Sequence, residues 1–505
     1  EGAALVGEPR PTEQMVKFYE KGDRPLEFVI TRQWFVRVLE HKEALLAQGD
    51  KIQWHPAHMK TRYTHWVEGL NQDWCISRQR YFGVPFPVWY RVGADGEPDF
   101  ASPIFAAAEA LPMDPATDTP PGFNEDQRDV PGGFTGDPDV MDTWATSSMT
   151  PQIQSHWGID TERHARLFPM DIRPQAHDII RTWAFYTIVK AWMHSDEIPW
   201  YHVVLSGWIL DPDRKKMSKS KGNVVTPDDL LLEWSSDAVR YWAARARLGT
   251  DTAFDPGVFK VGKRLATKVF NASRFVLMQL ERAEGALPGV EQISEPLDLA
   301  LVERLRTTVE QATRAFDAFD YATALQAAEE SFWQFCDHYL ELVKLRSYAE
   351  EDTAGRRSAL AALALALRAF LRLLAPFVPF VTEEVWSWSF AGEDRERSVH
   401  TAPWPVIGEF AAVRPPSATG VFEAAVEVMT KIRGAKTIAQ RSLRWPVASL
   451  EIVGAEEDRA ALAPVLDDIL RAGNVVDGGL VLSDGAAPEG ERFAITITLG
   501  EEEAS

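Results

Sequence analysis

Two lysines in one short polar segment could act on a phosphate group, since the segment reads Lys216-Met217-Ser218-Lys219-Ser220. Ammonium groups three residues apart suit a polyphosphate whose negative charge grows as a bond breaks. Small polar residues and Gly222 around them predict a loop that can close on a substrate. The competing interpretation of any lysine cluster is a solvated turn, so the order of the residues has to decide.

That order resembles the signature loop of the class I aminoacyl-tRNA synthetases, and it is closely preceded by Gly207-Trp208-Ile209-Leu210. The resemblance implies that the loop binds ATP and stabilises the transition state of aminoacyl-adenylate formation. It implies catalytic roles for Lys216 and Lys219. The residues that it implies as ATP contacts are Lys216, Ser218, Lys219, Ser220, Gly207 and Asp178. We expect Mg²⁺ with the ATP, held mainly by phosphates and water.

Two further motifs narrow the amino acid. The first resembles the subgroup that serves isoleucine, leucine and valine, and it reads Asp73-Trp74-Cys75-Ile76-Ser77-Arg78-Gln79-Arg80, with Gly83-Val84-Pro85 after it. Trp74 and Ile76 equally fit the core of a strand end. The second resembles the valine version and reads Asp139-Val140-Met141-Asp142-Thr143-Trp144-Ala145-Thr146-Ser147-Ser148. The resemblance makes Trp144 a wall of a pocket for a small branched side chain, unless it is an ordinary buried aromatic.

A fourth motif covers Gln175 to Trp183 and resembles the helix start that lines the active site in this family. There the acidic residue, here Asp178, serves the ribose or the amino group, and an isoleucine touches valine. Either Ile179 or Ile180 fits that contact, and the sequence does not choose between them. A junction from strand to helix is the expected place for nucleotide chemistry in a doubly wound fold.

The other signature of the family, His-Ile-Gly-His, is absent from all 505 residues, and the sequence begins at Glu1 without methionine. We therefore expect a C-terminal part that lacks the first half of the nucleotide fold and the domain that hydrolyses mischarged tRNA. Such a fragment is expected to be inactive alone and not to edit. The complete protein is expected to be a monomer.

Hydrophobic periodicity divides the chain into four parts. We expect a connector over residues 1–30 and an α/β nucleotide-binding part over residues 31–252, which the resemblance makes the C-terminal half of a Rossmann-type catalytic domain. The Gly/Pro/Asp-rich stretch from Gly93 to Asp139 is expected to be an inserted loop region. Residues 253–407 predict a helical bundle, and residues 420–505 predict a small α+β domain.

The helical part resembles the anticodon-binding bundle of the same family. The segments that carry this resemblance are 268–275, 332–341 and 375–386. Lys268 and Phe275 are the candidate tRNA contacts, because unstacked bases require a cation and a stacking ring. Many valine enzymes end in a coiled-coil arm, but the C-terminal part of this chain has no heptads.

Composition limits the partners further. The net charge of −21 argues against nonspecific DNA binding, although several basic clusters leave RNA possible. Two cysteines exclude a disulfide framework and favour the reducing cytoplasm. The most apolar stretch, 360–380, contains two arginines and two prolines, which predicts a buried helix and no membrane span. His55 and His58 lack further ligands, so no metal site is expected.

Together these resemblances imply the activity of a valine–tRNA ligase, whose substrates are valine, ATP and tRNA(Val). The order Asp142-Thr143-Trp144 disfavours isoleucyl-tRNA synthetase, which is the alternative within the enzyme class. A noncatalytic tRNA-binding half-synthetase is the alternative from outside it.

Overall fold

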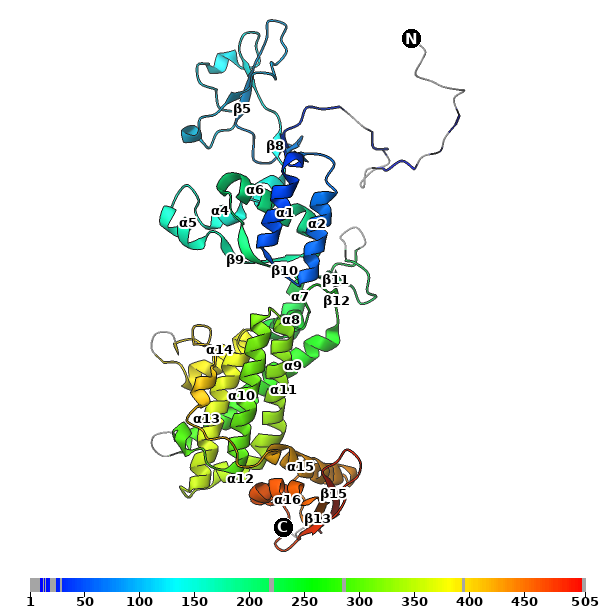
Figure 1. Ribbon diagram of the computed structural model, residues 1–505, viewed down its shortest axis with the longest axis vertical. Coiled ribbons are helices and arrows are strands. Elements are labelled where there is room, and N and C mark those ends of the chain that lie inside the picture. The colour runs from blue at the N-terminus through cyan, green and yellow to red at the C-terminus, as the bar shows by residue number, and fades with distance from the viewer. Residues whose placement is uncertain are drawn as a thin grey trace. The chain divides into compact units, whose positions relative to one another are not determined.

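The computed structural model describes residues 30–217, 222–283, 288–392 and 396–501, together with residues 10, 11, 13, 15–18 and 24–27. The chain folds as two compact units (Figure 1). The first comprises Glu1–Arg173 and Asp178–Val203, and the second comprises Pro174–His177 and Val204–Ser505. The domain boundaries expected at residues 30, 252, 407 and 420 stay predictions.

The first unit is built on a sheet with the strand order β2-β10-β9. These strands are β2 (Gln53–His55), β10 (Trp200–Ser206) and β9 (Met170–Ala176), and the covering helices are α1 (Lys42–Lys51), α2 (Lys60–Glu68) and α6 (Phe185–Ser195). Helix α1 packs against α2 and α6, with Tyr63 and Phe185 fully buried in the core. The apolar run 201–205 lies within β10.

The stretch expected to be an inserted loop region belongs to a small antiparallel sheet. Strand β5 (Val88–Arg91) pairs with β6 (Ile104–Phe105) and with β7 (Phe134–Gly136), and Phe86, Val88 and Tyr90 form its small core. The interpretation as a loop was therefore incomplete. Strands of two to four residues, separated by glycine and proline, are too short to show a period of two in the sequence.

Helices of the second unit form a bundle (Figure 1). They are α7 (Pro227–Trp234), α8 (Ser236–Ala244), α9 (Pro256–Glu281), α10 (Pro296–Asp317), α11 (Tyr321–Gln334), α12 (Leu340–Tyr348), α13 (Ala354–Leu374) and α14 (Pro379–Ser389). Side chains fix several starts: Asp255, Asp320 and Thr353 each accept a hydrogen bond from a backbone N–H of the first turn. Such caps contribute about 1 kcal/mol each.

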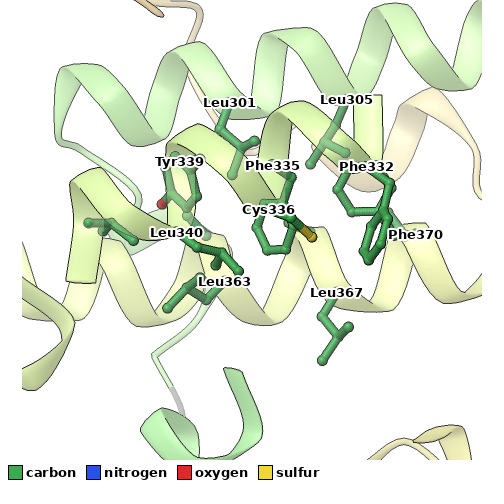
Figure 2. Packing of buried hydrophobic residues seen from close by; sticks show 14 of the residues in the cluster. Leu301, Leu305, Phe332, Phe335, Cys336, Tyr339, Leu340, Leu363, Leu367 and Phe370 are labelled. Carbon is green, nitrogen blue, oxygen red and sulfur yellow. The ribbon is translucent and has the colours of Figure 1, made fainter. Parts of the chain in front are cut away.

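Helix α13 lies at the centre of this bundle and buries nearly every side chain from Ser358 to Leu374. Figure 2 shows Phe370 of α13 facing Phe332 and Phe335, at ring-centroid distances of 5.4 and 5.3 Å. The apolar stretch at 360–380 is thus a buried helix followed by α14, as expected. Among the described residues, no helix is both long and apolar enough to cross a membrane.

A C-terminal α+β segment follows the bundle. It consists of α15 (Val421–Ile438), β13 (Val447–Gly454), α16 (Glu456–Leu462), α17 (Leu466–Gly473), β14 (Leu480–Asp484) and β15 (Phe493–Leu499). The central strand β13 pairs in parallel with β14 and antiparallel with β15, and α15 packs on α17 and β15. A 3₁₀ turn over Ala463–Val465 separates α16 from α17, since Pro464 cannot continue the helical hydrogen bonds.

Buried charges join this segment to the bundle. The guanidinium of Arg346 in α12 donates hydrogen bonds to Asp298 of α10 at 2.7 and 2.9 Å, and to Asp468 of α17 at 3.0 and 3.1 Å. Asp298 is fully buried and also accepts from Tyr339 and Ser358. Burial acts in the opposite direction, but the two carboxylates raise the pKa of the Arg346 guanidinium. The C-terminal α+β segment is therefore tied to the bundle through a paired charge.

Candidate active site and RNA-binding surface

Two of the sequence motifs lie side by side in the first unit. Strand β4 (Ser77–Arg78) pairs antiparallel with β8 (Val140–Met141), so that Ser77 faces Met141 and Arg78 faces Val140. The backbone N–H of Asp142 donates to the carbonyl of Ile76 at 2.7 Å, and the guanidinium of Arg78 lies 3.4 Å from the Asp142 carboxylate. The subgroup motif therefore supports the valine-type motif directly.

Other residues of the subgroup motif stabilise the fold of the first unit. The Asp73 carboxylate accepts hydrogen bonds from the backbone of Val38 and Leu39 at 2.9 and 3.0 Å. Trp74 is buried and stacks on Tyr186 of α6, with ring centroids 3.8 Å apart and planes within 4°. The alternative interpretation of Trp74 as a core residue is therefore correct.

Trp144 lies on the short helix α3 (Thr143–Ser147) and is half-buried. The end of α3 is fixed by Trp183, whose indole N–H donates to the carbonyl of Ser147 at 3.0 Å. The guanidinium of Arg173 lies 3.1 Å from the centroid of the Trp183 ring and 5.4 Å from that of Trp200. Burial lowers the pKa of Arg173 to about 10. Arg173 and Trp183 thus connect the valine-type motif to the fourth motif, a role the sequence did not reveal.

The fourth motif forms an irregular helix start. A 3₁₀ turn covers His177–Ile179, a π-helical turn covers Ile180–Ala184, and α6 follows. Single π turns inside helices are frequent at functional sites. Asp178 is exposed and Ile179 is half-buried, whereas Ile180 is only 2% exposed and belongs to the core. Of the two isoleucines that the sequence left open, Ile179 is the accessible one.

In the second unit, Gly207 stands where no side chain fits. A Cβ atom there would lie 2.2 Å from the carbonyl oxygen of Thr250, so a larger residue would displace the backbone. The next residue, Trp208, donates its backbone N–H to Asp251 at 2.8 Å and receives the ring of His177 edge-on at 4.8 Å. Strand β11 (Ile209–Leu210) then pairs in parallel with β12 (Thr252–Ala253). This close packing fixes the base of the lysine loop.

Asp211 joins the two ends of that loop. Its buried carboxylate accepts from the Lys215 backbone at 2.7 Å and from the Asn223 amide at 2.8 Å. The hydrogen bond from Asn223, followed by that from Lys215, lowers the pKa of Asp211. The ammonium group of Lys216 lies 4.2 Å above the Trp208 ring. The other predicted loop contacts, Ser218, Lys219 and Ser220, lie outside the described residues.

No group of three or more His, Cys, Asp or Glu side chains that could hold a metal ion occurs in the described part of the chain. His55 instead lies 3.0 Å from His202 through their ring nitrogens, and the two rings stack. Burial, and then the charge of His202, lower the pKa of His55.

Both predicted tRNA contacts lie on α9, in two pockets that share Asn271. Lys268 and Arg264 line a pocket of about 450 Å³ whose other lining residues are Trp234, Lys260, Lys263, Thr267 and Trp333. The Lys268 ammonium pairs with Asp337 at 2.8 Å and lies 5.5 Å from the Trp333 ring. Phe275 is half-buried and lines the second pocket, of about 470 Å³, with Arg274 and Trp388. Trp234, Trp333 and Trp388 also line these pockets, and they were not predicted as RNA contacts because their place beside α9 depends on helix packing.

Comparison with known proteins places these features in a family. The family model for class I tRNA synthetases of the isoleucine, leucine, methionine and valine group matches residues 13–255. The family model for the anticodon-binding domain of tRNA ligases matches residues 298–451. A methionyl-tRNA synthetase of Mycobacterium tuberculosis in complex with methionyl-adenylate shares the fold at a TM-score of 0.55 and 20% identity, over 78% of this chain and 71% of that one. A leucyl-tRNA synthetase of Agrobacterium radiobacter does so at 0.54 and 22%, over 70% and 46%.

Closer relatives are valine–tRNA ligases. The ligase of Salinispora tropica is 52% identical over 485 residues, which cover 92% of this chain and 56% of that ligase. The ligase of Thermobifida fusca is 51% identical, over 94% of this chain and 53% of its own length. The chain thus spans about half the length of these relatives. It belongs to the class I aminoacyl-tRNA synthetases and is homologous to the valine–tRNA ligases over more than nine-tenths of its length.

Proposed function

We propose that this chain is part of a valine–tRNA ligase, acting in the cytoplasm on valine, ATP and tRNA(Val). Sequence identities of 52% and 51% to valine–tRNA ligases support valine as the amino-acid substrate. The observation that supports it most is the pairing of β4 with β8, which joins the motif of the branched-chain subgroup to the valine-type motif that contains Trp144. In this proposal Trp144 and Ile179 line the valine pocket.

Chemically, a carboxylate oxygen of valine would attack the α-phosphorus of ATP, and pyrophosphate would leave as the bridging P–O bond breaks. A hydroxyl of the terminal ribose of tRNA would then attack the carbonyl carbon, and AMP would leave. Lys216 and Lys219 would neutralise the charge that grows on the leaving phosphates. Bound with ATP, Mg²⁺ would add charge neutralisation, held mainly by phosphate oxygens and water.

The other residues would position the substrates. Asp178 is exposed at the start of the irregular helix and would accept a hydrogen bond from the ribose or the amino group of valine. Asp211 would set the length of the lysine loop by holding Lys215 and Asn223. Arg264, Lys268 and Phe275 would bind unstacked anticodon bases in the two pockets, which tryptophan side chains also line.

The 505 residues alone are expected to bind tRNA but to form no valyl-adenylate, because they contain no His-Ile-Gly-His signature. The test mixes purified chain with ATP, valine and labelled pyrophosphate, and separately titrates tRNA(Val) at two salt concentrations. Binding should weaken as salt rises, since it would rest on cations that displace counterions from phosphate. Robust exchange by the chain alone would contradict the expectation that it forms no valyl-adenylate. Absence of binding at low salt would contradict the proposed tRNA-binding role.

Trp144→Ala in the complete ligase is expected to erode discrimination against isoleucine. Removing the ring opens the pocket to the extra methylene of isoleucine. One methylene in a hydrophobic site changes the discrimination free energy by about 1–3 kcal/mol, a range that was itself established on aminoacyl-tRNA synthetases. The measurement is kcat/KM of pyrophosphate exchange with valine and with isoleucine. Trp157→Ala is a suitable control, because Trp157 is 42% exposed and lies outside the motif. An unchanged ratio in the Trp144 variant would place the pocket elsewhere.

A further inference from the structure

One segment of this acidic protein carries only positive charge. Between Glu427 and Glu451 there are five basic side chains and no acidic one, although the whole chain has a net charge of −21. The five are Lys431, Arg433, Lys436, Arg441 and Arg444. Lys431 pairs with Glu491 at 2.6 Å, and Arg433 donates to the carbonyl of Asp337 at 2.5 Å. The remaining three belong to the end of α15 and the loop that follows it.

Lys436 is a buried cation that holds this loop. It is 1% exposed, and its ammonium donates to the carbonyl oxygens of Leu443 at 2.9 Å and Gly473 at 2.8 Å. Burial lowers the pKa of Lys436. An ammonium buried in this way is tolerated only where hydrogen bonds replace water. Lys436 therefore fixes the loop against the C-terminal end of α17.

Three more hydrogen bonds complete the fixation. The backbone N–H of Arg441 donates to the carbonyl of Lys436 at 2.8 Å, and the Asn474 amide donates to the carbonyl of Arg444 at 2.7 Å. The indole of Trp445 donates to the carbonyl of Gly500 at 2.9 Å. All of these bonds use backbone atoms of the loop or the Trp445 ring. The arginine side chains are left to face outward.

The fixed loop presents cations together with apolar side chains. Every residue from 437 to 444 is exposed, including Ile438 at 86% and Leu443 at 57%. The Arg441 guanidinium lies 4.1 Å from the centroid of the Trp445 ring, within the range of a cation–π contact. A rigid loop loses little conformational entropy on binding, so more of the free energy of its contacts contributes to affinity.

We propose that the loop 437–445 is a second RNA-binding surface, whose Arg441 and Arg444 contact the phosphate backbone of the tRNA. Guanidinium groups match the geometry of phosphate, and a positive patch on a negative protein directs a polyanion to that place. The proposal rests on the tRNA-binding role proposed above. It extends that role from the bases held at α9 to a stretch of backbone beyond them.

Asp337 contacts both α9 and α15 within the second unit. Asp337 accepts a hydrogen bond from Lys268 of α9 with its carboxylate and one from Arg433 of α15 with its backbone carbonyl. Only about 7.5 Å of helical rise separates Arg433 from Ile438, the last residue of α15. Lys268 and the loop are therefore linked through Asp337 and the last turns of α15.

The test uses the 505-residue chain and titrates tRNA(Val) at several salt concentrations. R441Q/R444Q is expected to weaken binding about tenfold and to reduce the slope of log affinity against log salt by roughly 1.4–1.8, the value for two phosphate contacts. The control R314Q/R357Q loses the same charge from one exposed and one half-buried position that already have acidic partners, and it should bind as the parent does. Circular dichroism would verify that every variant is folded.

A third variant, R264Q/K268Q, separates this proposal from the function on which it rests. If it weakens binding while R441Q/R444Q and the control both match the parent, the loop proposal is overturned and the tRNA-binding role stands. If the parent chain does not bind tRNA(Val), both are overturned. Iodine cleavage of phosphorothioate-labelled tRNA should show backbone protections that R441Q/R444Q loses and R264Q/K268Q retains. Loss of the same protections in both variants would contradict a separate surface.

Discussion

Arg346→Met is expected to lower the free energy of unfolding of the helical bundle by about 3–5 kcal/mol, because it leaves two buried carboxylates without their cation. The side chain of Asp298 has no exposure and that of Asp468 has 15%, so water cannot replace the guanidinium. The measurement is urea unfolding followed by circular dichroism at neutral pH. The C-terminal α+β segment should also become more accessible to protease, since Asp468 is its link to α12.

Two companion variants decide whether the charge itself is responsible. Arg357→Met removes an arginine whose partner Asp352 is mostly exposed, and it should cost less than about 1 kcal/mol. Neutralising the carboxylates as well, in D298N/R346M/D468N, should recover part of the loss, because uncompensated charge is the main penalty. A triple variant less stable than R346M would show that packing, and not charge, sets the effect.

Lys216→Ala in the complete ligase is expected to slow valyl-adenylate formation about 10²- to 10³-fold, the usual loss when one donor to a developing negative charge is removed. The Michaelis constant for ATP should change much less, because the interaction strengthens as the bond to pyrophosphate breaks. Single-turnover formation of the adenylate measures the rate constant without interference from product release.

The adjacent Lys215→Ala is the matched control for this prediction. Lys215 carries the same charge on the same loop, but its side chain is 69% exposed and lies 3.6 Å from Asp213. It should therefore change the rate only a few-fold. Equal losses in the two variants would mean that the loop contributes a diffuse positive field. An unchanged rate in the Lys216 variant would remove that residue from the catalytic assignment.

Motifs of fixed order gave most of what could be predicted about the site. Lys216, Trp144 and the pair Ile179-Ile180 were predicted because each stands within a run of residues whose types and spacing resemble those of one family. Selection between the isoleucines needed the structure. Both fit the helix start equally in sequence, and only packing makes Ile180 a core residue and leaves Ile179 accessible.

Positioning residues could not be predicted in the same way. The contact of Arg173 with the Trp183 ring depends on a 3₁₀ turn and a π turn between them, and neither leaves a period in the sequence. Nothing in the sequence distinguishes Lys436 from a solvated cation, although the fold buries it against two carbonyl groups. Long helices such as α13 were predictable, because their apolar residues repeat over many turns.

Arg346 and Asp468 are synthesised at different times during translation, so their ion pair forms late. The two residues are 122 positions apart, which corresponds to about 6–24 s of translation at roughly 5–20 residues per second. Asp298 is made before Arg346, so the bundle can close on Arg346 with one of its two carboxylate partners, which already balances the charge of the guanidinium. Emergence of α17 supplies the second carboxylate. A nascent bundle therefore passes through an interval in which the Nε–H of Arg346 lacks its acceptor on Asp468, and another anionic group could occupy that place.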